Sequence, residues 1–387
     1  MPDAFIVEAV RTATGRRNGR LSAIHPNDLG AVCLDALADR TGIDPAAVDD
    51  VILGCVTQAG EQSMHVARNV VLASKLPQSV PAVTIDRQCG SSQQALHFAA
   101  QAVMSGTMDI VIAGGIESMS RVPMGTAALP DTGAQPWSKS VLDRFGVASF
   151  SQFIGAEMIA RKWDFARQTL DAFALESHRR AAAATRAGAF ESEIAPVEIA
   201  LADGTAGLHD KDEGIRYEAS MEAISGVKLL REGGVISAAN ASQISDGSSA
   251  VMIVSAKALK EHGLTPLARI ANLTVSAGDP VIMLEEPLRA TGIALKKAGL
   301  KIDDIDLYEV NEAFAPVPLA WLKHTGADPQ KLNVNGGAIA LGHPLGASGT
   351  KLMATLVHAL KKRGGKYGLQ TMCEGGGMAN VTIVESL

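Results

Sequence analysis

Aromatic residues are scarce in this chain of 387 residues, at 4% of the composition, and charge of one sign never accumulates in a long run. The formal net charge is -6, and no basic stripe is present. Proteins that bind nucleic acid usually combine a basic surface with exposed aromatic side chains on which bases stack. The composition therefore excludes nucleic acid, and equally an anionic membrane surface, as the main partner.

Cysteine is also scarce. None of the four cysteines belongs to a CxxC pair, and no Cys/His cluster has the spacing of a zinc site, so we expect no metal. Four scattered cysteines in a chain of this length do not indicate a disulfide framework, which favours a reducing cytoplasm. The cysteines are Cys33, Cys55, Cys89 and Cys373.

Long apolar runs are missing as well. A membrane-spanning helix needs about 18 or more consecutive apolar residues, and no stretch of the chain approaches that length. The segment from Met1 to Gly15 carries Asp3 and Glu8 and lacks a signal-peptide pattern. We therefore predict a cytoplasmic protein without a membrane span.

What the chain does contain is an alternation of short apolar runs with helical patterns. Apolar side chains recur at helical spacing between Cys89 and Met104, and Gly106 follows as a stop signal. This alternation predicts an α/β protein with a mainly parallel sheet. The expected strands are 5–10, 51–56 and 109–113, with a further helix over 29–40.

The same pattern recurs in the second half of the chain. Residues 303–307 repeat the Asp-Asp-apolar pattern of residues 49–53. The expected strand 368–373 resembles the expected strand 109–113, and both of these strands precede a glycine-rich turn. We interpret this as an internal duplication, although any two βαβ units resemble each other to some degree. The stretch between the halves, about 122–230, contains loop-like prolines and a charged helix, and we interpret it as an inserted loop domain.

The first segment with chemical character is Asp86-Arg87-Gln88-Cys89-Gly90-Ser91-Ser92. An apolar run precedes it and a long helix follows, so Cys89 is predicted at a strand-to-helix junction. The free N–H groups and partial positive charge of a helix N-terminus favour a thiolate and should lower the cysteine pKa. Most lone cysteines are buried core residues, but the small Gly and Ser neighbours leave room around this sulfur. We therefore predict that Cys89 is a nucleophile.

A second segment, 333–349, holds five glycines and one histidine, His343. So many glycines predict a sharply turned loop that presents an imidazole suited to accepting a thiol proton near neutral pH. A phosphate-binding loop with a passive histidine is the alternative, but neither GxxxxGK[ST] nor a clean GxGxxG is present.

Two further segments carry polar groups beside predicted strands. Cys373 precedes three glycines, which places a second thiol beside flexible backbone donors, and Asn311 and Glu312 follow a strand. Alone, each segment is more often structural than functional.

Together the segments resemble the thiolase family over nearly the whole chain. The matching motifs are Cys-Gly-Ser at 89–91, Gly-Gly-Ile-Glu-Ser-Met-Ser at 114–120, Asn-Ala-Ser at 240–242, Asn-Glu-Ala-Phe at 311–314, Gly-His-Pro at 342–344 and Cys-x-Gly-Gly-Gly at 373–377. The resemblance implies a five-layered αβαβα fold of two duplicated halves with an inserted loop domain. The expected divisions are residues 1–121 with about 231–264, about 122–230, and about 265–387.

Thiolases make or break a carbon–carbon bond between acyl groups carried on coenzyme A. By resemblance, Cys89 holds the acyl group as a thioester, His343 takes its proton, and Cys373 is the second acid/base. His343 with a water held by Asn311 would form one oxyanion hole, and the backbone N–H groups of Cys89 and Gly375 the other. Ser242 matches a position that touches the pantetheine arm, and Met283 one that lines the acyl pocket.

One departure concerns the substrate. Many thiolases have Met-Gly shortly before an Ala-Glu pair, where this chain has Gln152 and Phe153. We therefore expect degradative cleavage of longer or bulkier 3-ketoacyl-CoA, in fatty-acid or side-chain β-oxidation, and not a preference for acetoacetyl-CoA. A biosynthetic acetoacetyl-CoA thiolase is the alternative.

Two competing hypotheses keep part of the motif set. A ketoacyl synthase-like enzyme would also load its cysteine, but Cys373 in a glycine-rich loop argues against it. A non-catalytic scaffold should have lost a catalytic position, and all are present. The resemblance further implies an acyltransferase with acyl-CoA and coenzyme A as substrates, no permanently bound cofactor, and a homodimer or homotetramer.

Overall fold

In the computed structural model, which describes residues 2–201 and 204–387, ten strands form one large mixed sheet. Its order is β10-β11-β12-β9-β1-β8-β5-β3-β4, with β2 paired to β8. The strands are β1 (Ala4–Arg11), β2 (Gly15–Arg16), β3 (Asp50–Gly54), β4 (Ala82–Ile85), β5 (Ile110–Ser118), β8 (Ser245–Ser255), β9 (Ala268–Ala277), β10 (Leu307–Val310), β11 (Tyr367–Glu374) and β12 (Met378–Ser386).

The strand order repeats, which confirms the predicted duplication. In the first half β3 and β5 are parallel and β5 continues antiparallel through β8 to β1. In the second half β10 and β11 are parallel and β11 continues antiparallel through β12 to β9. The halves meet where β1 pairs with β9, through Phe5–Arg269 and Ile6–Ala268.

The prediction of a mainly parallel sheet is wrong. Among the described strands of the large sheet, three pairs are parallel and six are antiparallel. The long strands β8 and β12 run back beside β5 and β11, and the β11–β12 connection is a short glycine hairpin at 375–377. The β11–β12 hairpin needs no crossover helix, and β8 follows β5 only after the long segment 119–244. The βαβ pattern of the sequence therefore revealed neither return.

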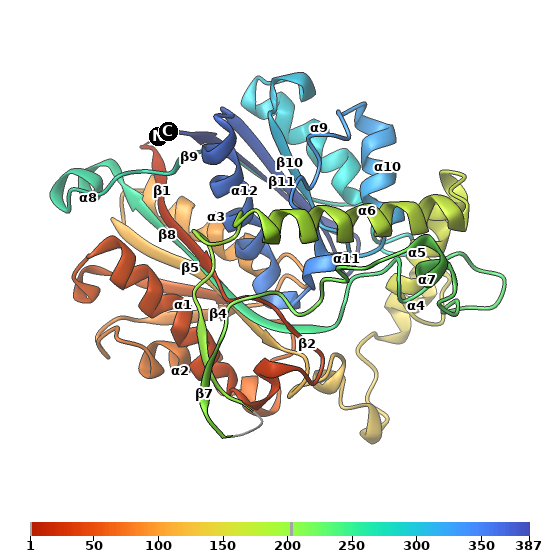
Figure 1. Cartoon of the computed structure of the whole chain (residues 1–387), viewed down its shortest axis with the longest axis horizontal. Coiled ribbons are helices and arrows are strands. Elements are labelled where there is room, and N and C mark those ends of the chain that lie inside the picture. Colours follow the sequence, from red (N-terminus) through yellow and green to blue (C-terminus); the bar gives the residue numbers. More distant parts are fainter. Residues whose placement is uncertain (1, 202–203) are drawn as a thin grey trace.

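Helices lie on both outer faces of the sheet halves and between them (Figure 1). Three apolar cores lie between these layers. In the central core, side chains such as Leu96 and Leu356 pack against both halves of the sheet. This is the expected five-layered αβαβα arrangement. The outer helices are α1 (Pro26–Thr41) and α2 (Val66–Ala73) on one side, and α9 (Glu286–Ala298) and α10 (Pro316–Thr325) on the other; the central helices are α3 (Ser91–Met104) and α12 (Ser348–Arg363).

The two central helices approach closely at their N-termini. A Cβ on Gly349 of α12 would collide with the backbone nitrogen of Gln93 in α3. The Thr350 backbone N–H also donates to the Ser92 hydroxyl at 3.1 Å. Because equivalent helices of the two halves start at one place, the loops that precede them meet there.

The segment between the halves covers one side of this meeting point. Figure 1 shows α6 crossing the molecule beside α11. No helix in the described part of the chain has both the length and the apolarity that crossing a bilayer requires. The remaining elements are α4 (Lys139–Phe145), α5 (Gln152–Lys162), α6 (Arg167–Arg186), α7 (Met221–Ser225), α8 (Ala256–Glu261), α11 (Ala338–Leu341) and the hairpin strands β6 (Val197–Ala200) and β7 (Ala206–His209).

Candidate active site

Cys89 lies in the turn that joins β4 to α3, as predicted. Gln88 adopts a left-handed φ of 49°. The Ser91 hydroxyl accepts a hydrogen bond from the Arg87 backbone N–H at 2.9 Å and donates one to the Gln88 carbonyl at 2.6 Å. The turn is therefore held rigidly, and it presents the partly exposed Cys89 immediately before the first turn of α3.

The prediction that the helix start lowers the pKa of Cys89 is wrong for the resting site. Burial of the sulfur is the largest cause, followed by the Glu374 charge, and together they raise the pKa of Cys89 to about 12, although the residue as a whole is partly exposed. Loss of water around the sulfur outweighs the dipole of a short stretch of free N–H groups. Cys89 is thus a thiol at rest and needs a base to become a nucleophile.

His343 is the predicted base. It follows Gly342, whose φ is +79°, and its own Nδ1 lies 2.5 Å from the Ser348 hydroxyl oxygen. The Ser348 hydroxyl donates its only proton to the Pro344 carbonyl at 2.9 Å, so the hydroxyl oxygen must accept a hydrogen bond from Nδ1 of His343. The network therefore assigns the imidazole proton to Nδ1 and leaves Nε2 unprotonated, as an acceptor that also faces Asn311 Nδ2 at 3.4 Å.

Burial, and then the charge of Lys351, lowers the pKa of His343 to about 3. The imidazole is consequently neutral at every pH near neutrality. A neutral imidazole whose Nε2 carries no proton is the form that can accept the proton of a thiol.

Asn311 lies beside this imidazole. It follows β10, is buried, and is anchored by its backbone N–H to the Thr371 carbonyl at 3.0 Å. Its Nδ2 lies 3.4 Å from His343 Nε2, while its Oδ1 has no hydrogen-bond partner among the described residues. Water is the ordinary partner of such a buried oxygen, which agrees with the expected water-holding role.

Cys373 comes from the end of β11 in the second half of the molecule. It is fully buried, and its pKa lies well above the ordinary value because of burial and the nearby Cys89 and Glu374 charges. The two cysteine loops interlock, since a Cβ on Gly90 would collide with Glu374 and one on Gly375 would lie 3.0 Å from Gln88 Oε1. The fold thus unites thiols that are far apart in sequence.

The backbone donors of the second expected oxyanion hole are also at this junction. Neither the Cys89 nor the Gly375 backbone N–H donates to another residue in the described part of the chain. Free N–H groups at a turn can stabilise an oxyanion without breaking existing hydrogen bonds.

A cavity of about 530 Å³ opens beside His343. Ser242 lines it, as do both residues of the departure from the family pattern, Gln152 and Phe153. Met283 lies elsewhere: it is buried under α5, near Gly155, and is not on the cavity wall, so its role in the acyl pocket stays a prediction. Most of the remaining lining is apolar: Met119, Met124, Leu230, Ala238, Ala241, Ile244, Ala313, Phe314 and Leu345.

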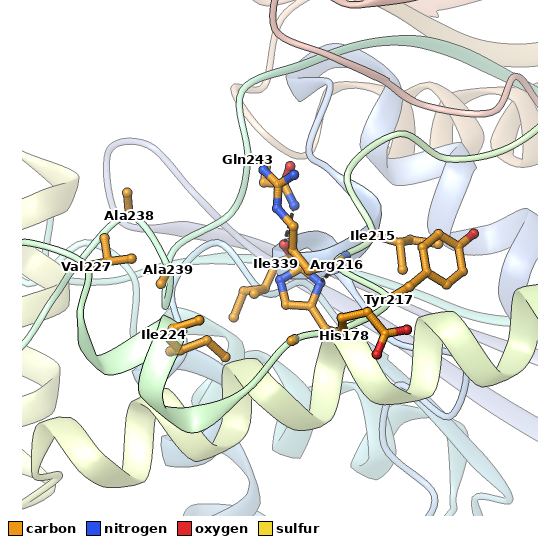
Figure 2. A pocket seen from close by; sticks show the side chains of 13 residues that line it. His178, Ile215, Arg216, Tyr217, Ile224, Val227, Ala238, Ala239, Gln243 and Ile339 are labelled. Carbon is orange, nitrogen blue, oxygen red and sulfur yellow. Dashed lines mark hydrogen bonds between the residues drawn. The ribbon is translucent and has the colours of Figure 1, made fainter.

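A second cavity, of about 640 Å³, adjoins the first and shares Arg216, Ala238 and Gln243 with it. Figure 2 shows Arg216 and Gln243 side by side above His178 of α6. Gln243 connects this region to the base, because its carbonyl accepts from the His343 backbone N–H at 3.2 Å. The two spaces therefore lead from the covering segment to the catalytic imidazole.

Sequence reasoning missed several of these residues. It named no cation for the coenzyme phosphates, yet Arg16, Arg17 and Arg216 line the first cavity. It also missed Ser348, whose only signal is its place five residues after His343, and Lys351, whose ammonium donates to the Gly342 carbonyl at 3.1 Å.

Two family models cover almost the entire chain. The thiolase N-terminal domain matches residues 4–257, and the thiolase C-terminal domain matches residues 264–386.

Individual relatives match the chain over nearly its whole length. The steroid 3-ketoacyl-CoA thiolase FadA6 of Mycobacterium tuberculosis is 54% identical, over 100% of this chain and 95% of the relative. The acetyl-CoA acetyltransferase of Chromobacterium violaceum is 42% identical over 99% of each chain. The crystal structure of human mitochondrial 3-ketoacyl-CoA thiolase superimposes with a TM-score of 0.90 at 38% identity, covering 100% of this chain and 99% of that one. The chain therefore belongs to the thiolase family.

Proposed function

We propose that this thiolase is degradative: it cleaves 3-ketoacyl-CoA with coenzyme A to acetyl-CoA and a shortened acyl-CoA. The observation that carries the proposal is the 54% identity, over the whole chain, to a relative named as a steroid 3-ketoacyl-CoA thiolase. The proposed chemistry rests on the hydrogen-bond chain from His343 through Ser348 to the Pro344 carbonyl. These hydrogen bonds leave Nε2 of the neutral imidazole unprotonated, and Cys89 is a thiol that cannot ionise unaided.

In the first half of the cycle, His343 Nε2 takes the proton of Cys89, and the thiolate attacks the 3-keto carbon. The backbone N–H groups of Cys89 and Gly375 stabilise the resulting oxyanion. The bond between C2 and C3 then breaks, and the electron pair passes to the acetyl-CoA enolate. The protonated His343 and the water at Asn311 stabilise the enolate oxygen, and Cys373 donates its proton to the α-carbon.

In the second half, the Cys373 thiolate takes the proton of an incoming coenzyme A thiol. The coenzyme A sulfur attacks the acyl-Cys89 thioester, and the shortened acyl-CoA leaves. Cys89 departs as a thiolate and recovers its proton from His343. Every group is then in its starting protonation state.

The two adjoining cavities are suited to coenzyme A. A pantetheine arm would pass Ser242 toward His343, and the phosphates would lie near arginines at the rim. Arg17 and Arg216 form no ion pair with any residue in 2–201 or 204–387, so their charges are available to an anionic ligand.

The acyl chain is expected to be long or bulky. Phe153, which stands where many relatives have the Gly of Met-Gly, packs edge-on against Phe314 with ring centroids 5.6 Å apart, and both line the apolar cavity. FadA6, the 54% identical relative, is named for steroid substrates.

The decisive assay is thiolysis of 3-ketoacyl-CoA substrates of graded length, including one with a steroid-type side chain. We expect kcat/KM to rise from acetoacetyl-CoA toward the longer or bulkier substrates. Cleavage of acetoacetyl-CoA far faster than of all others would instead support the biosynthetic alternative.

The roles of the two cysteines can be separated by mass spectrometry. Incubation with a 3-ketoacyl-CoA but without free coenzyme A should leave the acyl group on Cys89, with Cys33 and Cys55 as unmodified internal controls. Cys373→Ala should lose carbon–carbon cleavage, by about 10²–10⁴-fold. If Cys373→Ala cleaved at the wild-type rate, the two-cysteine mechanism would be wrong.

We also propose a homo-oligomer in a reducing compartment such as the cytoplasm. All four cysteines are free. Strand β4 is at the sheet edge, where Val83 is exposed, and the neighbouring Met64 and Phe98 are exposed too. Exposed apolar side chains along a sheet edge are typical of an interface. Light scattering after size exclusion would contradict this proposal if it gave a mass near 40.2 kDa, that of one chain.

A further inference from the structure

Glu374 is a buried carboxyl group for which the cycle above has no use. It directly follows Cys373 at the end of β11 and is completely buried. Its side chain lies against Gly90, the residue after Cys89, because a Cβ there would collide with Glu374 Oε1. The carboxyl therefore lies between the two cysteine loops.

The carboxyl oxygens lack the partners that a buried carboxylate needs. Neither oxygen makes a hydrogen bond of normal geometry to a residue in the described part of the chain. A buried charge without partners is far more costly than a buried neutral acid.

Arg87 is the cation that lowers the pKa of the Glu374 carboxyl, although the two side chains form no ion pair. Its guanidinium lies 3.9 Å from the Met378 sulfur, its Nε has no partner among the described atoms, and no ion pair joins it to Glu374. Burial raises the pKa of Glu374 to about 8, and the Arg87 charge and the Asn380 backbone N–H offset only part of that rise.

The electrostatic effect of this carboxyl falls on both catalytic thiols. After burial, the Glu374 charge is the next largest cause that raises the pKa of Cys89, and it also raises that of Cys373. The other charges facing Cys89 are Glu117 and Asp86, which act in the same direction but more weakly. Beyond Arg87 lies His97, a neutral imidazole that is hydrogen-bonded to Asn380.

We propose that Glu374 is a positioning residue, held as a neutral carboxylic acid between the cysteine loops, and that its ionisation in alkaline solution suppresses formation of the Cys89 thiolate. The catalytic meaning of this inference rests on the proposed function. Its chemical prediction concerns Cys89 alone and can be measured without turnover.

The test compares full-length wild-type protein and Glu374→Gln, a neutral variant of nearly the same shape. Each is alkylated with iodoacetamide between pH 6.5 and 9.5, and the Cys89 peptide is quantified by mass spectrometry. At pH 6.5 both side chains are neutral, so the two rates should agree. Above pH 8 the wild-type carboxyl is charged, and Glu374→Gln should react about threefold to tenfold faster.

A rate ratio that does not change with pH would overturn the inference. A constant ratio of one would mean that the carboxyl does not influence Cys89, and a constant larger ratio would mean that it is ionised throughout. Glu385→Gln, on the surface side of β12, is the matched control and should give a ratio of one at every pH.

Two further variants keep the test decisive. Glu374→Met also lacks the ionisable group and replaces Glu374→Gln if that variant folds poorly by circular dichroism. Arg87→Met removes a positive charge that stabilises the Glu374 carboxylate, so the pKa of Glu374 should rise. Suppression of Cys89 alkylation in this variant should therefore begin at a higher pH than in the wild type. Thiolysis by the same wild-type sample is assayed separately, so that failure of the proposed function is not mistaken for failure of this inference.

Discussion

At the residue scale, the reactivity of Cys89 depends on groups that lie far away in the sequence. Its sulfur is a poor nucleophile at rest, with a pKa raised to about 12, and His343, which stays neutral, is the base we propose for it. His343 in turn depends on Ser348 for its tautomer and on Lys351 for part of its low pKa.

Lys351→Met should narrow the pH range of the enzyme. Burial and then the Lys351 charge lower the pKa of His343 to about 3, so removing the charge raises that pKa toward its ordinary value. More of the imidazole is then protonated in acid, where it cannot accept a proton. Because burial is the larger cause of the low pKa, we expect the acid limb of kcat/KM to move to higher pH by about one unit, well short of the ordinary histidine value, with no change at pH 8.

The measurement is a pH profile of kcat/KM for thiolysis, with Lys351→Arg as the control. Arginine keeps the positive charge and can still donate to the Gly342 carbonyl, so its acid limb should match that of the wild type. An unshifted acid limb in Lys351→Met would show that Lys351 supports the loop only mechanically.

The sequence motifs predict which groups react but not how those groups ionise. Cys89, His343, Cys373 and Asn311 stand at motif positions; the fold pairs the two cysteine loops, and it pairs Asn311 with His343. The direction of the Cys89 pKa shift could not be predicted, because it depends on burial and on Glu374, which reaches Gly90 only after the halves pack. Met283 was placed by resemblance, and the fold buries it behind α5.

At the scale of the elements, the site exists because α3 and α12 start at one place. Periodicity predicted α3 and the apolar run that precedes it, since one-sided apolar patterns are local signals. It did not predict the return strands β8 and β12, which are buried along most of their length and show no alternation. Their antiparallel pairing depends on contacts between distant segments.

Gly349→Ala should disrupt the contact between the central helices. The added methyl would collide with the backbone of Gln93, and backbone cannot move aside as a flexible side chain can. We expect a loss of about 2–3 kcal/mol in the free energy of unfolding, with a larger loss of activity because Cys89 and His343 would separate. Urea denaturation and thiolysis measure the two effects.

Gly292→Ala is the matched control. Gly292 lies in α9, is exposed, and has open space where a Cβ would be added. Alanine should stabilise that helix by about 0.5–1 kcal/mol. Equal effects of the two substitutions would mean that the helix crossing is not tightly packed.

At the scale of the whole molecule, a buried ion cluster fastens the covering segment to the sheet. Arg11 of β1 is completely buried and binds Glu193 at 2.6 Å and both oxygens of Asp212, at 2.8 and 3.0 Å. Asp212 also accepts from the Thr14 backbone N–H at 2.7 Å. Nothing in the local sequence around Arg11 predicts partners about two hundred residues away.

Asp212→Asn should cost about 3–5 kcal/mol of unfolding free energy, because it leaves part of the Arg11 charge buried without its partner. Burial raises the pKa of Asp212, but the Arg11 charge and hydrogen bonds more than offset this and hold it below the ordinary 3.8. A lowered carboxyl pKa stabilises the fold above the unfolded-state value, and this stability is lost as pH falls through the folded-state value. The deficit should therefore be the same at pH 7 and pH 5 in urea titrations; a deficit that disappears at pH 5 would contradict this assignment.

The pairing of β1 with β9 has a consequence for how the chain could be rewired. Ala4 and Ser386 lie in strands that meet the same stretch of β9, and Figure 1 shows the two ends side by side. A short linker could join these ends, and a new opening could be cut between Glu261 and Leu264, at the passage from one half to the other. Such a circular permutant would exchange the order of the halves while keeping every strand neighbour, since only connectivity would change.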